Sequence, residues 1–139
     1  MATLRDIKAA LRAEGIEVYL TKEDAIHIAE RPRENLIMDS GVRLFADLRV
    51  GFYARSEASS FPGLEAEQMY DRVRRQLAPA GEHGFAEVRH FVNDIEAPSD
   101  ATKILDRWFE IFYVRECNSL DEALQLVRTA IGFNKVVKR

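Results

Sequence analysis

The chain has 139 residues, a length typical of one folded domain. It carries 20 Lys and Arg residues against 23 Asp and Glu residues, and the net charge of −3 excludes the strong positive field of an autonomous nucleic-acid-binding domain. Hydrophobic residues make up 47% of the chain, which excludes a disordered segment, and its one cysteine excludes a disulfide within the chain.

The first predicted element is a helix that begins after Thr3. Thr3 is a candidate N-cap, and Asp6 three residues later completes a variant of the capping box. The apolar residues that follow at helical spacing are Leu4, Ile7, Ala10 and Leu11. Gly15 then supplies the left-handed residue that commonly ends a helix.

Alternating apolar residues follow this helix and predict a β-hairpin. Residues 16–20 and 25–29 each place apolar side chains at every second position, and the polar residues 21–24 between them predict a turn. Pro32 lacks a backbone N–H for a strand ladder, so we expect a loop around it.

The longest alternating segment covers residues 42–55. Its even-numbered residues from Val42 to Phe52 are all apolar, whereas the odd positions are mostly polar. A period of two that holds for about a dozen residues predicts one long strand with one buried face. We expect a short strand at 36–38 and a tight turn at 39–41 before it.

A second helix is expected from residue 64 to about residue 78, where apolar residues recur at helical spacing. The serine-rich segment 56–63 before it is the best candidate for a mobile loop, and 79–84 is expected to be a connection. Two further strands are then expected at 85–95 and 108–117.

These last two strands are expected to form a hairpin. The segment 96–103 between them contains Pro98, Ser99 and Asp100, so we expect a loop there and a hairpin centred near Ala101.

The final predicted helix has the clearest start. Ser119 and Glu122 match a capping box, and an apolar face runs from Leu120 to Ile131. The element order is therefore α-β-β-β(β)-α-β-β-α, which favours a single α+β domain over residues 1–139. We expect one antiparallel sheet of five or six strands with three helices.

This order of elements, from the Leu4–Leu11 helix to the Leu120–Ile131 helix, resembles that of the YbjN-type and type III secretion chaperone-like families. The resemblance covers nearly the whole chain and consists of element order, without a sequence motif. It implies a non-enzymatic homodimer that binds segments of other proteins.

Histidine, cysteine and carboxylate residues form no specific catalytic or metal-binding pattern in the sequence. The histidines, none of which has a second ligand at a recognised metal spacing, are His27, His83 and His90. Cys117 has no histidine base on its strand face and is expected to be a structural thiol. Asp106 and Glu110 share a strand face and are the remaining acid–base candidates.

One feature favours an interaction surface. The strand at 108–117 is apolar on both faces, and three helices are too few to cover both sides of a sheet of this size. Exposed apolar strips of this kind are usually interfaces. The residues that we expect to form it are Phe45, Arg49, Tyr53, Trp108 and Phe112.

The sequence therefore predicts a non-catalytic protein-binding or chaperone-like module that forms a homodimer. A small-ligand-binding or regulatory domain with a pocket near 56–63 is the first alternative, and a small enzyme that uses a strand carboxylate is the second. We expect no catalytic residues, metal ligands or cofactors. The expected partner is a second copy or another protein, with no nucleic acid and no membrane. The charged N-terminal segment lacks a signal-peptide core, so a cytoplasmic location is expected.

Overall fold

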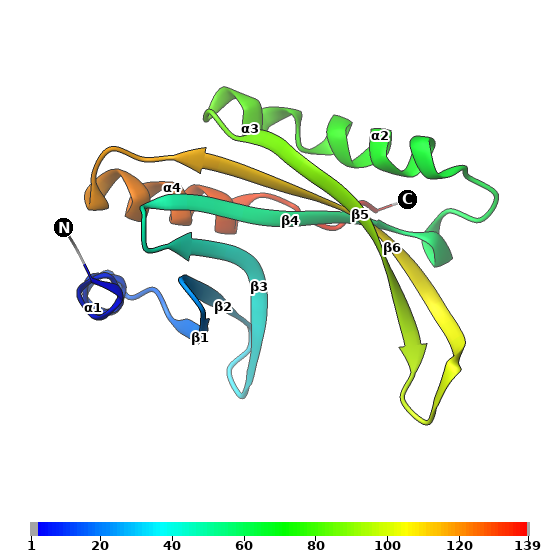
Figure 1. Ribbon diagram of the computed structural model, residues 1–139, viewed down its shortest axis with the longest axis horizontal. Helices are drawn as coiled ribbons and strands as arrows, with labels where there is room; N and C mark the ends of the chain where they lie inside the picture. Colours follow the sequence, from blue (N-terminus) through cyan, green and yellow to red (C-terminus); the bar gives the residue numbers. More distant parts are fainter. Residues whose placement is uncertain (1–2, 139) are drawn as a thin grey trace. The chain divides into compact units, whose positions relative to one another are not determined.

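The computed structural model describes residues 3–138 and has an α+β fold with one six-stranded antiparallel sheet, which confirms the predicted fold class (Figure 1). The strand order in the sheet is β1-β2-β3-β4-β6-β5. The strands are β1 (Val18–Lys22), β2 (Ala25–Arg33), β3 (Leu36–Phe45), β4 (Arg49–Glu57), β5 (Ala86–Ala97) and β6 (Asp100–Glu116). The helices are α1 (Leu4–Ala13), α2 (Ala66–Gln76), α3 (Ala78–Glu82) and α4 (Leu120–Gly132), with a 3₁₀ turn, η1, at Ala58–Ser60.

The chain divides into two compact units, which we describe in turn. The first lies within Met1–Phe52 and Val114–Gly132, and the second within Tyr53–Tyr113 and Phe133–Arg139. Strands β4 and β6 each contribute residues to both units.

The first unit begins with α1, whose start is the predicted one. The Thr3 hydroxyl oxygen accepts a hydrogen bond from the Asp6 N–H at 3.1 Å, and the Asp6 carboxylate accepts one from the Thr3 N–H at 3.2 Å. This reciprocal pair is a complete capping box. Ile7 and Leu11 lie on one face of the helix and are fully buried.

The core of the first unit lies on one face of strands β2, β3 and β4. Its fully buried side chains alternate along these strands, as the sequence pattern predicts, and helix α4 packs against β3. The largest of these strand residues are Ile26, Ile28, Val42, Leu44, Val50 and Phe52.

The predicted single strand over residues 42–55 is wrong, because the chain reverses direction within it. Residues 46–48 form a turn in which the Leu48 N–H donates to the Phe45 carbonyl oxygen at 2.9 Å, and Leu48 has a φ of 68°. Leu44 therefore pairs with Val50, and Val42 pairs with Phe52. Because the loop has three residues, even-numbered residues of β3 pair with even-numbered residues of β4 and lie on the same face of the sheet. The alternating pattern of the sequence therefore continues through the turn.

The tight turn that we expected at 39–41 is also absent, because these residues lie inside β3. Gly41 has a φ of 84°, and the pairing of β2 with β3 shifts between His27 and Ala29. The buried Ser40 hydroxyl donates to the Ile28 carbonyl oxygen at 2.6 Å. The glycine thus serves a β-bulge rather than a chain reversal.

In the second unit, the expected connection at 79–84 contains an additional helix. Helix α2 ends at Gln76, and the short helix α3 follows with Pro79 in its first turn. Proline is tolerated there because the first N–H groups of a helix have no partner inside it. Residues 3–138 therefore contain four α-helices and not the three that were predicted.

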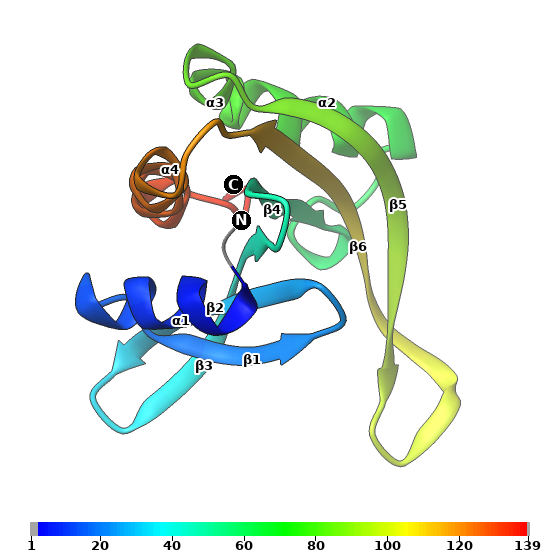
Figure 2. The same cartoon turned by 60° about the vertical axis from the view of Figure 1, so that its left-hand side comes forward.

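Strands β5 and β6 form the longest hairpin of the second unit, which extends as a two-stranded ribbon (Figures 1 and 2). The turn consists of Pro98 and Ser99, so the expected loop at 96–103 and the centre near Ala101 are wrong. Near the C-terminal end of the described residues, Val136 forms a parallel bridge with Arg55.

Candidate functional site

The predicted interface residues Tyr53 and Phe112 lie against each other in the second unit. Their ring centroids are 4.5 Å apart, and Phe91 approaches Tyr53 edge-on at 6.0 Å. The Arg89 guanidinium lies over the Phe112 ring at 5.2 Å, and its Nη2 donates to the Tyr53 hydroxyl oxygen at 3.0 Å. Phe112 is consequently only 6% exposed, and Tyr53 is half-buried.

Trp108, another predicted interface residue, is also held within the second unit. The Arg55 guanidinium lies 3.8 Å from the centre of its ring, and the indole Nε1 donates to the Asp106 carboxylate at 3.2 Å. Asp106 also accepts hydrogen bonds from the Ser59 N–H at 2.9 Å and the Ser59 hydroxyl at 2.7 Å. These contacts connect the 3₁₀ turn to the strand that carries Trp108.

The remaining two predicted residues, Phe45 and Arg49, lie beside the β3–β4 turn in the first unit. The Arg49 guanidinium lies over the Phe45 ring at 4.4 Å, while its Nε donates to Asp47 at 2.8 Å. In each unit, therefore, arginine side chains lie over aromatic rings of the predicted strip. Arginine and aromatic residues are enriched in protein interfaces, and whether these five residues bind a partner stays a prediction.

The most exposed apolar side chains of the second unit lie elsewhere, on the β5–β6 hairpin. We call its outer part, residues 92–105, the arm. On or next to the arm, four large apolar side chains are strongly exposed: Val88 at 58%, Val92 at 46%, Ile104 at 42% and Leu105 at 54%. Ile104 and Leu105 are neighbours in β6 and so point to opposite faces, which leaves both faces of the arm uncovered.

Sequence reasoning missed the arm because Pro98, Ser99 and Asp100 predict a loop. The signal that favours strands is the β-branched residues on either side of this expected loop, which are Val92, Ile95 and Ile104.

The histidines all have structural neighbours. His27 Nδ1 lies 3.4 Å from Asp39, yet burial and the charge of Arg43 lower the pKa of His27. His90 packs edge-on against Tyr70 at 4.6 Å, and His83 lies 5.9 Å from the Phe133 ring. His83 and His90 are exposed, and His90 Nδ1 also lies 3.5 Å from the Glu87 carboxylate.

The pKa values of Cys117, the candidate nucleophile, and Asp106, a candidate acid, both shift in directions that do not favour catalysis. Burial, together with the charge of Glu122, raises the pKa of Cys117, so its thiol is protonated and weakly nucleophilic at neutral pH. Burial acts to raise the pKa of Asp106, but its hydrogen bonds from Ser59, Arg107 and Trp108 outweigh burial and lower it. A lowered pKa suits a hydrogen-bond acceptor and not a general acid.

The region of the predicted pocket does contain a hollow. It has a volume of about 340 Å³ and is lined by Ser60, Phe61, Pro62, Leu64 and Arg72. The Arg72 guanidinium lies over the Phe61 ring at 4.6 Å. This hollow reaches the lower end of the volumes that small-molecule sites have.

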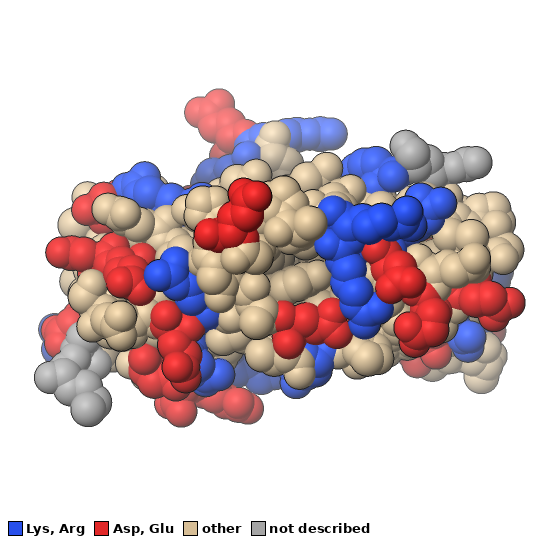
Figure 3. Space-filling model, turned by 90° about the horizontal axis from the view of Figure 1, so that it is seen from above, with Lys and Arg blue, Asp and Glu red and all other residues tan. Residues whose placement is uncertain are grey.

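Arg74 on α2 is paired with carboxylate groups. Arg74 contacts three carboxylates, with Nε to Glu87 at 2.9 Å, Nη1 to Asp71 at 2.9 Å and Nη1 to Glu67 at 3.9 Å. The hydrogen bond from Arg74 in turn lowers the pKa of Glu87. Seen from the side of α2, basic and acidic side chains lie next to one another (Figure 3).

Comparison with known protein families, with curated proteins and with solved structures finds no match to this chain. Within residues 3–138, no group of three or more His, Cys, Asp and Glu side chains is arranged to hold a metal ion. No helix in this described range is both long and apolar enough to cross a membrane.

Proposed function

We propose that the chain is a non-catalytic protein-binding module that forms a homodimer through the edge of β5 and the arm. The observation that carries this proposal is the exposure of the arm on both faces. A two-stranded ribbon is marginally stable in water unless something packs on it. A second copy paired at the edge of β5 would add two more strands beside this ribbon and would partly bury the exposed valines of β5, each contributing about 1 kcal/mol.

The edge of β5 supports a second copy as the occupant. β5 is a terminal strand, with β6 as its one neighbour among the described strands. A twofold axis normal to the sheet pairs such an edge with itself in antiparallel fashion, and residues opposite each other are then symmetric about the axis. With the axis at His90, Val88 faces Val92 of the second copy, and Arg89 faces Phe91 of the second copy. The two most exposed valines of β5 would thus cover each other.

The test is the mass of the protein in solution, measured by analytical ultracentrifugation at micromolar concentrations. We expect the wild type to sediment at twice the 15.9 kDa mass of the chain. Val92→Lys should shift it to the monomer, because a lysine would replace the valine that faces Val88 of the other copy on each side of the axis. Ile37→Lys, a matched change at a side chain of β3 that is 38% exposed, should leave the dimer intact.

A wild type that remains a monomer at every concentration would overturn this proposal. The variant Tyr53→Glu distinguishes the β5 interface from an interface formed by the predicted aromatic residues Tyr53, Trp108 and Phe112. If Tyr53→Glu dissociates a dimer that Val92→Lys leaves intact, the interface is formed by these aromatic residues and not by β5.

A second candidate function is small-ligand binding, favoured by the hollow of about 340 Å³ beside Arg72. A compound that binds there should shift the NMR signals of Ser60 and Leu64 and lose affinity in Arg72→Ala. A screen of small carboxylates that leaves these signals unmoved would remove this candidate for that ligand class.

A further inference from the structure

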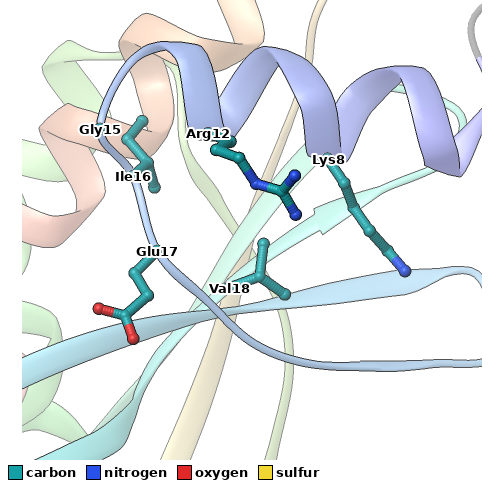
Figure 4. A pocket seen from close by; sticks show the side chains of 6 residues that line it. All are labelled: Lys8, Arg12, Gly15, Ile16, Glu17 and Val18. Carbon is teal, nitrogen blue, oxygen red and sulfur yellow. The ribbon is translucent and has the colours of Figure 1, made fainter.

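A basic hollow lies between α1 and the start of β1 in the first unit (Figure 4). Its volume is about 450 Å³, and it is lined by Lys8, Arg12, Gly15, Ile16, Glu17 and Val18. Lys8 and Arg12 are one helical turn apart on α1, and both side chains extend from the helix toward β1. Arg5 continues the same helical face toward the N-terminus, so α1 presents a basic stripe along this side.

The hollow has an excess of positive charge, because its one carboxylate is already paired. Glu17 accepts hydrogen bonds from Arg31 Nε at 2.7 Å and Arg31 Nη2 at 2.8 Å, and these bonds lower the pKa of Glu17. Its side chain points away from Lys8 and Arg12. Within the described part of the chain, neither Lys8 nor Arg12 lies within 4.0 Å of a carboxylate oxygen.

An open strand edge lies beside this charge. β1 is the other terminal strand of the sheet and has β2 as its one neighbour among the strands described. Next to the hollow, Tyr19 is 42% exposed and Leu20 is 40% exposed. The buried Ile16 and half-buried Val18 form an apolar floor between these side chains and the two basic residues.

We propose that this edge binds an extended acidic segment of another protein, which adds to β1 as a further strand. Its backbone would pair with the open edge, its apolar side chains on one face would cover Tyr19 or Leu20, and its carboxylates on the other face would reach Lys8 and Arg12. This site uses different residues and a different unit from the β5 dimer, so either proposal can fail without the other.

The apolar neighbours favour a peptide over a nucleic acid as the occupant. Phosphate binding alone would be satisfied by the basic stripe and would leave Tyr19 and Leu20 exposed to water. A strand with alternating acidic and β-branched residues matches both features, since successive side chains of a strand point to opposite sides.

The probe is a fluorescein-labelled peptide of alternating Glu and Val, eight residues long, read out by fluorescence anisotropy. We expect saturable binding that weakens as salt is added, because part of the attraction is between charges. A peptide of alternating Lys and Val should bind at least about tenfold more weakly, because its charge repels Lys8 and Arg12. A Glu–Val peptide methylated on alternate backbone nitrogens should also bind about tenfold more weakly, because it cannot complete the strand ladder.

Substitutions locate the site on the protein. Lys8→Glu and Arg12→Glu should each weaken binding of the Glu–Val peptide by about tenfold, because each reverses one of two attracting charges. Arg33→Glu is the matched control, since it makes the same charge change at an exposed arginine of β2 that does not line the hollow. Circular dichroism of each variant should match that of the wild type, because Lys8 is half-exposed and Arg12 is exposed.

Three results would overturn this proposal. The first is equal binding of the Glu–Val and Lys–Val peptides. The second is equal loss of binding in Arg33→Glu and Arg12→Glu. The third is full displacement of the peptide by a single-stranded oligonucleotide that binds more tightly than the peptide and whose binding does not depend on Tyr19 and Leu20. That result would assign the basic stripe to nucleic acid.

Discussion

The β3–β4 hairpin and the β5–β6 hairpin share a simple plan but have opposite surroundings. Each joins two antiparallel strands through a short turn. In the first, Val42, Leu44, Val50 and Phe52 are completely buried. In the second, most residues of the arm are exposed, although they are also paired in strands. The comparison shows that strand pairing does not by itself bury a residue, and that the elements packed on a strand determine its burial.

Burial of a charge is the strongest way to test this contrast. Leu44→Asp should prevent folding, because it would place an unpaired carboxylate in the core at a cost of at least about 4 kcal/mol. In the monomeric Val92→Lys background, Leu105→Asp on the arm should change the free energy of unfolding by less than about 0.5 kcal/mol. Urea titration followed by circular dichroism measures both. Equal destabilisation would mean that the arm is packed as tightly as the core.

Amide hydrogen exchange compares the local stability of the two hairpins. In the monomeric Val92→Lys variant, amides of residues 93–97 should exchange about a hundredfold faster or more than those of Val50 and Phe52. The reason is that the arm has few buried contacts to oppose local opening. In the wild-type dimer, the β5 amides should become slower as protein concentration rises. Exchange in the arm as slow as in β4 under monomeric conditions would contradict the contrast.

The base of the arm should respond to acid. Asp106 connects β6 to the 3₁₀ turn, and Asp106→Ala should cost about 1–2 kcal/mol of stability through its lost hydrogen bonds to Ser59 and Trp108. The pKa of Asp106 is lowered in the folded chain. Its contribution is therefore complete above the unfolded pKa of about 3.9 and is lost as pH falls through the folded value.

Urea midpoints measured between pH 7 and pH 2 test this linkage. The wild type should lose more stability on acidification than Asp106→Asn, because the asparagine does not titrate. Parallel pH curves for the two proteins would show that this carboxylate is not coupled to folding.

The smallest expected effect concerns the helix that covers the packed hairpin. The Ser119 hydroxyl oxygen accepts a hydrogen bond from the Glu122 N–H at 3.2 Å. Ser119→Ala should therefore cost about 1 kcal/mol through loss of the N-cap of α4. It should also speed amide exchange in β3, where α4 packs, and leave the arm unchanged. An unchanged urea midpoint would show that the cap contributes nothing measurable.

The predicted helix starts illustrate what the sequence can determine. Thr3 and Asp6 act only on neighbours within one turn, so their pattern was sufficient to place α1. At α4 the Ser119 half of the box is present, but the Glu122 carboxylate accepts a hydrogen bond from Arg115 at 3.2 Å. Arg115 is distant enough in sequence that no helix-start pattern includes it.

The missed chain reversal at 46–48 has a different cause. A loop with an odd number of residues leaves alternation unchanged, so a pattern of period two cannot distinguish one long strand from this hairpin. The residue at position 48 does not indicate a turn either, because Leu48 adopts a positive φ that is usually adopted by glycine.

The candidate surfaces were predicted less completely than the fold. The sequence predicted that Trp108 and Phe112 belong to an interface, but it did not show that Arg55 and Arg89 lie over their rings, because that arrangement depends on strand register. The hollow beside β1 was not predicted at all. Lys8 and Arg12 look like an ordinary solvated helix face until the position of β1 is known.

The chain has a single tryptophan, and it lies where the ribbon leaves the packed part of the second unit. Indole emission depends on its immediate surroundings, and here these are a guanidinium group on the ring and a carboxylate on the nitrogen. A movement of the arm relative to the packed part of the second unit would change the positions of the Arg55 guanidinium and the Asp106 carboxylate around the indole. Trp108 is therefore a built-in optical reporter, and its spectrum can follow assembly of the unlabelled protein in real time.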